Sequence, residues 1–304
     1  MKNHILLGKL LMNAFKILGK AQKEIEIELN KFKFSEEIVK DFKNLNFKES
    51  FKKNFFTLLI ISLLIESKVS KKYIISYTKI IIYLRQIVTS TDNILDNENK
   101  GLIFIKKLKN NIVSNSLVML MCQNLLTKEC LEITKGNDEA VKKIFEKIYI
   151  IAISESLRDK SQYKEYPKDK YILEEIHSGI GGELLKISLE IPLIVEENLK
   201  LKEFSKGIYE IGMSLQALDD FFDIDEDEES GKINLLKAEL VYKKIEKKDE
   251  EIKEEYLKKV SSNAYNGFKI LENNDFPINQ KEAKKVLKKL FELRGLKEYT
   301  YILD

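Results

Sequence analysis

Apolar residues recur with a period near 3.6 along almost the entire chain, and no stretch alternates with period two for more than a few residues. This pattern predicts an all-helical protein. The expected helices cover residues 3–31, 35–45, 49–67, 70–96, 103–133, 138–158, 169–190, 196–224, 236–271 and 279–298. A polar loop is expected around Pro167 and an acidic loop at 225–235, and the helix at 169–190 is expected to stop before Pro192.

Composition strengthens the helical prediction. The 304 residues include only 12 glycines and 3 prolines, too few breakers for a protein of many short strands. No Pro/Gly/Ser-rich linker divides the chain, so we expect one domain over residues 1–304.

Charge and cysteine content limit the classes of function. Lys+Arg is 52 and Asp+Glu is 49, so bulk charge gives no support for nucleic-acid binding. Cys122 and Cys130 lack CxxC spacing and are interpreted as reduced core thiols, which favours a cytoplasmic location.

Membrane association is expected to be peripheral at most. The longest apolar run, 55–65, is too short to span a bilayer, so no transmembrane segment is expected. The N-terminal stretch is interpreted as an amphipathic helix that packs on its own domain, with a membrane-surface helix or a signal peptide as alternatives.

Two acidic motifs carry the candidate chemistry. Asp92 and Asp96 lie one helical turn apart in DNILD, and Asp219 and Asp223 do so in DDFFD, where Asp220 lies beside them. A hard cation such as Mg²⁺ relieves the repulsion between such carboxylates and keeps positions open for phosphate. A polar helix end explains either motif alone, but two motifs that each end a long apolar helix favour diphosphate chemistry. A calcium loop starting at Asp223 is disfavoured, because its sixth and twelfth positions lack the required glycine and glutamate.

At these residues the chain resembles the trans-isoprenyl diphosphate synthase (polyprenyl synthetase) family of isoprenoid synthases. The second motif, LQALDDFFD, is complete, while Asn93 replaces the middle aspartate of the first. The resemblance covers roughly residues 45–240 and implies a single large all-α helical bundle with a central apolar cavity. It implies N-terminal helices at 1–45, a catalytic core at 46–240 and C-terminal helices at 241–304.

The same resemblance assigns roles to individual residues. The segments ENKGL, IHSGIGGELLKIS and ESGK match the family's phosphate-contacting segments in order, and SFKKNFF matches its basic segment for isopentenyl diphosphate. The implied metal ligands are Asp92, Asp96, Asp219 and Asp223, and the implied catalytic set adds Asp220. The implied substrate contacts are Lys52, Lys53, Lys100, His177, Gln216 and Lys232, with Leu84, Ile87 and Val88 limiting the length of the prenyl tail.

Each basic residue has an alternative to phosphate binding: the lysines could simply be solvated, and His177 could be a packed side chain without a ligand. The arginines of the family's isopentenyl diphosphate site are missing, and lysine cannot replace their bidentate grip on phosphate.

The implied function is Mg²⁺-dependent prenyl transfer. Three ions with the bound diphosphate would help an allylic prenyl diphosphate of C15 or longer to ionise, and the acceptor would be isopentenyl diphosphate or another molecule such as a peptide. A terpene cyclase acting on one prenyl diphosphate and a non-catalytic partner subunit are the alternatives. A homodimer formed through the apolar helix at 103–127 is expected by the same resemblance.

Overall fold

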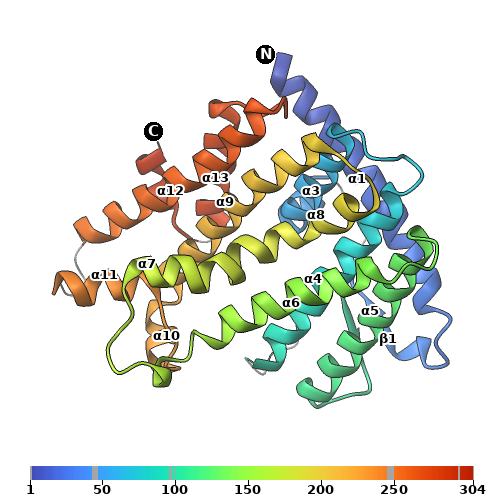
Figure 1. Cartoon of the computed structure of the whole chain (residues 1–304), viewed down its shortest axis with the longest axis horizontal. Helices are drawn as coiled ribbons and strands as arrows, with labels where there is room; N and C mark the ends of the chain where they lie inside the picture. The colour runs from blue at the N-terminus through green and yellow to red at the C-terminus, as the bar shows by residue number, and fades with distance from the viewer. Residues whose placement is uncertain are drawn as a thin grey trace. The chain divides into compact units, whose positions relative to one another are not determined.

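The computed structural model describes residues 2–42, 47–95, 98, 100–244, 250–293 and 295–303. Helices dominate these residues and form two compact units (Figure 1). The N-terminal unit comprises Leu6–Lys143 and Ser188–Asn198, and the C-terminal unit comprises Met1–Ile5, Ile144–Ile187 and Leu199–Asp304. The single domain expected over 1–304, with its parts at 1–45, 46–240 and 241–304, stays a prediction.

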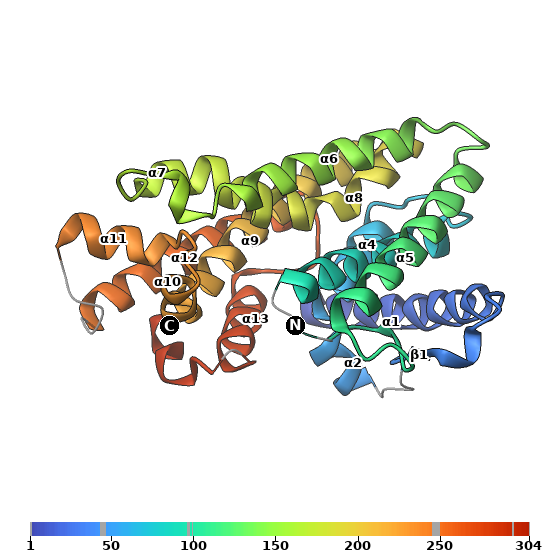
Figure 2. The ribbon, with the colours of Figure 1, turned by 90° about the horizontal axis from the view of Figure 1, so that it is seen from below.

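The N-terminal unit is built from long helices and one small sheet. Its elements are α1 (Lys2–Leu29), η1 (Ser35–Glu37), β1 (Ile38–Lys40), α2 (Phe47–Lys53), α3 (Phe55–Glu66), α4 (Ile74–Leu95), β2 (Ile103–Ile105) and α5 (Asn111–Ile133). Helices α4 and α5 pack along each other (Figure 2). Lys79 of α4 is buried, and its Nζ lies 2.6 Å from Oε2 of Glu129 on α5, so the charge between these helices is paired.

The C-terminal unit holds most of the remaining helices. The elements that follow α5 are α6 (Glu139–Ser156), η2 (Lys160–Gln162), α7 (Asp169–Tyr171), the π-helical segment η3 (Ile172–Glu183), α8 (Leu184–Val195), α9 (Leu199–Phe222), α10 (Ile224–Glu229), α11 (Leu235–Lys243), α12 (Glu250–Asn273), α13 (Gln280–Leu293) and η4 (Lys297–Leu303). The first residues of α6 and the last of α8 belong to the N-terminal unit.

Helix α9 is the centre of the C-terminal unit and packs along both α12 and η3 (Figure 1). Glycines allow the close approach. A Cβ at Gly181 of η3 would lie 2.7 Å from the carbonyl oxygen of Gly212 on α9, and a Cβ at Gly207 would lie 2.7 Å from that of Gly267 on α12. The backbone of α9 therefore touches its neighbours directly on two sides.

Four expectations about secondary structure were wrong. The helix expected at 103–133 begins only at Asn111, because Ile103–Ile105 form the strand β2. In place of a helix at 35–45, η1 is followed by β1, which pairs antiparallel with β2, since Ile38 and Val39 are β-branched. Helix α8 continues through Pro192, whose neighbours Leu189 and Ile191 are fully buried, so apolar packing offsets the missing hydrogen bond. The acidic stretch after α9 begins with a short helix, α10, whose first turn carries three carboxylates where the helix dipole favours them.

None of the described helices combines the length and apolar character that crossing a membrane requires. Cys122 and Cys130 of α5 are buried free thiols, and burial raises the pKa of each to about 12.

Candidate functional site

The second acidic motif lies where α9 ends in the C-terminal unit. The backbone N–H of Asp223 donates to the carbonyl oxygen of Asp219 at 2.9 Å, so the helical turn continues through the motif. Asp219 is half-buried and Asp223 is exposed. Residues four apart on a helix share one face, so these two carboxylates can reach a common ligand.

The middle residue of the motif, Asp220, has a different role. Its side chain is 1% exposed, and its Oδ2 accepts hydrogen bonds from the backbone N–H of Leu235 at 2.6 Å and from Nε2 of His177 at 3.0 Å. Its Oδ1 accepts from Nε2 of Gln216 at 3.1 Å. Three donors thus compensate the buried carboxylate, which anchors the end of α9 inside the unit.

The structure therefore brings together three of the residues selected from the sequence, Gln216, Asp220 and His177. His177 comes from η3 and is 1% exposed, and its Nδ1 has no hydrogen-bond partner among the described residues. The expected contacts of His177 and Gln216 with diphosphate stay predictions, since both now have a structural partner in Asp220.

A second set of buried polar groups adjoins Asp220. Nδ2 of Asn234 donates to the carbonyl oxygen of Asp220 at 2.7 Å and to Oδ2 of Asp227 at 2.9 Å. Oδ1 of Asp227 lies 3.1 Å from Nη2 of Arg158. Burial raises the pKa of Asp227 above its ordinary value, although Asn234 and Arg158 act in the opposite direction.

Lys232 lies on the short segment between α10 and α11. Gly231 precedes it with φ +71°, a conformation that favours glycine, so the turn explains the Gly-Lys pair. Lys232 forms an antiparallel bridge with Asp159, and its backbone N–H donates to the carbonyl oxygen of Asp227 at 2.7 Å. With Lys160 and Lys237 it lines a small pocket, which Glu228 also lines, and Nζ of Lys237 lies 2.7 Å from Oε1 of Glu228. Lysines therefore outnumber carboxylates around this space.

The first acidic motif lies at the end of α4 in the N-terminal unit. Asp92 is exposed, whereas Asp96 is outside the described residues. Asn93 is 2% exposed, and its Nδ2 donates to the carbonyl oxygen of Lys100 at 2.6 Å and to Oδ1 of Asn115 at 3.0 Å. An aspartate cannot make these two donations, so the substitution in the motif has a structural reason.

The segment that follows this motif is held against α4 by side chains. Oδ1 of Asn93 accepts from the backbone N–H of Lys100, and Oε1 of Gln86 accepts from Leu102 and Ile103. The Lys100 side chain is exposed and forms an ion pair with Glu98. The backbone at Lys100 is thus fixed, while its ammonium group extends into solvent.

The basic segment at the end of α2 gains a partner that the sequence analysis missed. Lys52 and Lys53 are exposed, and Arg85 of α4 donates from Nη1 to Oδ1 of Asn54 at 2.7 Å and from Nη2 to the carbonyl oxygen of Lys53 at 3.2 Å. Burial lowers the pKa of Arg85, and no described carboxylate pairs with its guanidinium. A signal was present in the sequence, because only three of the 52 basic residues are arginines.

The residues expected to limit prenyl length lie on α4 before the first motif. Leu84 is buried in the N-terminal unit, whereas Ile87 and Val88 are partly exposed. Their effect on chain length stays a prediction.

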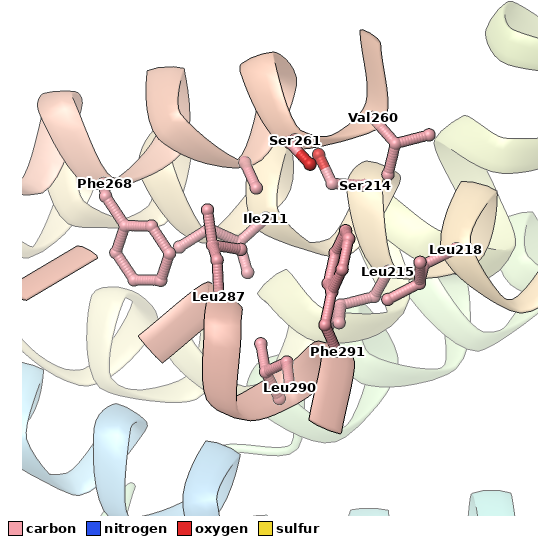
Figure 3. Close-up of a pocket in the computed structure, with 11 residues that line it drawn as sticks. Ile211, Ser214, Leu215, Leu218, Val260, Ser261, Phe268, Leu287, Leu290 and Phe291 are labelled. Atoms are coloured by element: carbon pink, nitrogen blue, oxygen red, sulfur yellow. The ribbon is translucent and has the colours of Figure 1, made fainter. Parts of the chain in front are cut away.

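An apolar pocket lies between α9, α12 and α13 of the C-terminal unit (Figure 3). It is lined by side chains such as Leu215, Leu218 and Phe291, and the hydroxyls of Ser214 and Ser261 point toward each other at its edge. Its volume of about 20 Å³ is space for about one water molecule, so it does not accommodate a prenyl chain.

The donor set suits Mg²⁺ in its chemistry, because Asp219, Asp223 and Asp92 offer carboxylate oxygens at solvent-accessible helix ends. Among the described residues, which leave out Asp96, three or more acidic, histidine or cysteine side chains nowhere gather into a metal-binding group. The two motifs belong to different units, and each contributes its own share of the expected ligands.

Comparison with solved structures identifies the fold. The chain is similar to a decaprenyl diphosphate synthase from Rhodobacter capsulatus, with TM-score 0.57 and 12% identity, over 99% of this chain and 98% of that one. It is also similar to a geranylgeranyl pyrophosphate synthetase from Pyrococcus horikoshii, with TM-score 0.53 and 17% identity, over 100% of this chain and 97% of that one.

A geranyltransferase from Helicobacter pylori, solved with magnesium and isoprenyl diphosphate, gives TM-score 0.51 at 14% identity, over 92% of this chain and 98% of that one. No family model matches the sequence, and no curated protein matches it. The chain therefore has the helical fold of the prenyl diphosphate synthases. The all-α isoprenoid synthase architecture expected from the two motifs is confirmed.

Proposed function

We propose that the protein is a Mg²⁺-dependent prenyltransferase that ionises an allylic prenyl diphosphate and transfers the prenyl group to an acceptor. The observation that carries this proposal is the arrangement at the end of α9. Asp220 is anchored inside the unit by three donors, while Asp219 and Asp223 share the outer face of the same turn. The fold, common to solved enzymes of this class, supports the proposal.

The chemistry assigns roles to the chain's own residues. Asp219 and Asp223 in the C-terminal unit would bind Mg²⁺, and so would Asp92 and Asp96 in the N-terminal unit. The bound ions would supply positive charge to the departing diphosphate. Lys232 and Lys100 would donate to diphosphate oxygens and add further positive charge. The bond between C1 and oxygen breaks, and its electron pair leaves with the diphosphate. The acceptor's electrons then form the new bond to C1, and the acceptor loses a proton.

An anionic acceptor such as isopentenyl diphosphate is favoured by Arg85. Its guanidinium donates to Asn54 and to the carbonyl oxygen of Lys53 and has no described carboxylate as partner. Its positive charge therefore lies at the SFKKNFF segment, where an anionic ligand would neutralise it. A terpene cyclase acts on a single diphosphate and gives this arginine no ligand.

The homodimer interface expected on the helix at 103–127 stays a prediction, and the surface of α6 offers a second candidate interface. Phe145, Tyr149 and Ile153 are spaced four apart, and their side chains are 48%, 67% and 42% exposed. Such an apolar stripe on a helix is costly in water and is covered when a second copy packs against it.

Product analysis tests the proposed function. The protein is incubated with Mg²⁺ and farnesyl or geranylgeranyl diphosphate, with and without isopentenyl diphosphate. A longer prenyl diphosphate supports elongation, and its loss in Arg85→Gln with substrate ionisation retained assigns the acceptor site. Diphosphate release with a hydrocarbon product would identify a cyclase. Absence of diphosphate release under all conditions would contradict the proposal and favour a partner subunit.

A further inference from the structure

Asn234 uses every polar atom it has. Its Oδ1 accepts from the backbone N–H of Lys237 at 3.0 Å and so caps α11, while its Nδ2 bonds Asp220 and Asp227 as described above. Its backbone N–H donates to the hydroxyl of Tyr166 at 2.8 Å, and that hydroxyl donates to its carbonyl oxygen at 3.1 Å. The residue is 1% exposed, so each of these bonds is protected from water.

The same residue joins two parts of the candidate site. On one side it holds the carbonyl of Asp220, the residue that follows Asp219 in the second motif. On the other side Asn234 directly follows the segment that carries Lys232. In that segment the backbone N–H of Ile233 donates to the carbonyl oxygen of Arg158 at 2.6 Å.

Capping alone does not require asparagine at this position. Aspartate and serine cap helices about as well, because only an acceptor oxygen is needed. The amide nitrogen is the additional feature, and it bridges a carbonyl and a carboxylate that would otherwise face each other without a proton between them.

We propose that Asn234 is a positioning residue, which fixes the Lys232 segment relative to the acidic end of α9 through the two donations of its amide. This inference rests on the proposed function for its consequence, the binding of a diphosphate between Lys232 and the outer carboxylates. The geometric part stands on the hydrogen bonds alone.

The variant Asn234→Asp tests the bridge, because it keeps the cap acceptor and removes both donations. Asn234→Ser keeps an acceptor oxygen without adding charge and replaces the two N–H donors by one shorter hydroxyl. In the double variant Asn234→Asp with Asp227→Asn, the new amide at position 227 can donate to the carboxylate at position 234, which restores a hydrogen bond between the two side chains. Asn110→Asp is the matched control, since Asn110 caps α5 by accepting from Val113 and its amide makes no other hydrogen bond to a residue that the structure describes.

The first readout needs no ligand. Trypsin cleavage of the folded protein between Lys232 and Ile233 requires the segment to leave Arg158, whereas cleavage between Lys206 and Gly207 within α9 requires the helix to open. We expect Asn234→Asp and Asn234→Ser to raise the ratio of the first cleavage to the second about tenfold, the effect of losing about 1.4 kcal/mol of hydrogen bonding. The double variant should recover most of the change, and Asn110→Asp should show the wild-type ratio.

The second readout is the affinity for inorganic pyrophosphate with Mg²⁺, measured by calorimetry. We expect about tenfold weaker binding in Asn234→Asp and partial recovery in the double variant. Wild-type cleavage ratios in both single variants would overturn the positioning role, as would a raised ratio with unchanged affinity. Failure of the wild-type protein to bind pyrophosphate would instead overturn the proposed function, and the cleavage ratio alone would then decide whether Asn234 holds the segment.

Discussion

Nε2 of His177 lies 3.0 Å from Oδ2 of Asp220, and both side chains are excluded from solvent. A carboxylate offers only acceptor oxygens, so Nε2 of His177 is the donor and Asp220 accepts. The pair joins η3 to the end of α9 and keeps the motif's middle carboxylate directed inward.

Removing the imidazole should therefore destabilise the protein. We expect His177→Leu to lower the free energy of unfolding by about 2 kcal/mol, the cost of removing one hydrogen bond from a buried charged group. His177→Gln keeps an amide donor and should lose less. Urea unfolding measures both, and equal losses in the two variants would show that packing, rather than the hydrogen bond, determines the effect.

The three aspartates of the second motif should separate into two kinds. Asp220→Asn places an amide among three donors and should lower the free energy of unfolding by about 2 kcal/mol. Asp219→Asn and Asp223→Asn should leave stability nearly unchanged and reduce prenyl diphosphate turnover by about 10²-fold or more. Thermal unfolding and turnover assays compare all three, and a stable, inactive Asp220→Asn protein would contradict this division.

Restoring the middle aspartate of the first motif should destabilise the protein. Asn93→Asp removes the donations to Lys100 and Asn115 and places a carboxylate opposite two acceptor oxygens. We expect a loss of about 2 kcal/mol in the free energy of unfolding and no gain in turnover. A variant as stable as the wild type, with faster turnover, would show that the missing aspartate limits the protein.

Glu183 gives the stability a dependence on pH. Burial acts to raise its pKa, but hydrogen bonds from Lys147 at 2.8 Å and Lys186 at 3.1 Å outweigh burial, so the pKa lies below its ordinary 4.5. A carboxyl with a lowered pKa in the folded state stabilises the protein above pH 4.5, and this contribution is lost as pH falls through the folded value.

We expect Glu183→Gln to be about 1 kcal/mol less stable than wild type at pH 7. The difference should shrink as the pH falls below 4.5 and vanish once the pH is below the pKa of Glu183 in the folded protein. Unfolding free energies across this range measure it, with the exposed Glu174→Gln as control. A constant difference at every pH would contradict an ionic contribution.

The stripe on α6 gives a prediction for assembly. Tyr149→Lys should dissociate a homodimer formed through α6 at micromolar concentration, because it places a charge at the most exposed position of the stripe. Leu199→Lys is the control, an equally drastic change at an exposed leucine outside the stripe. Light scattering after size-exclusion chromatography reads both, and a monomeric wild-type protein would contradict the dimer.

Periodicity was sufficient to predict most helices, because each buries one face along its own length. It could not predict β1, since Ile38 pairs with Ile105 far along the chain and three residues carry too little local pattern. The course of α8 through Pro192 depended on burial of its neighbours, a tertiary effect that propensity does not contain.

The site was predictable to a similar degree. Spacing identified the two acidic helix ends, but it could not show that Asn93 and Asp220 are buried and structural while Asp92 and Asp223 are exposed. Asn234 and Arg85 were missed because their importance comes from partners distant in sequence. For Arg85, the scarcity of arginine in the sequence was the only indication.

The only two thiols of the chain, Cys122 and Cys130, are both buried in α5 of the N-terminal unit. A thiol-reactive dye added to the native protein will therefore label these thiols only when the N-terminal unit unfolds locally. Local unfolding of the C-terminal unit will not change the labelling. The rate of thiol labelling therefore reports local unfolding of the N-terminal unit, which carries Asp92, in the protein without any mutation.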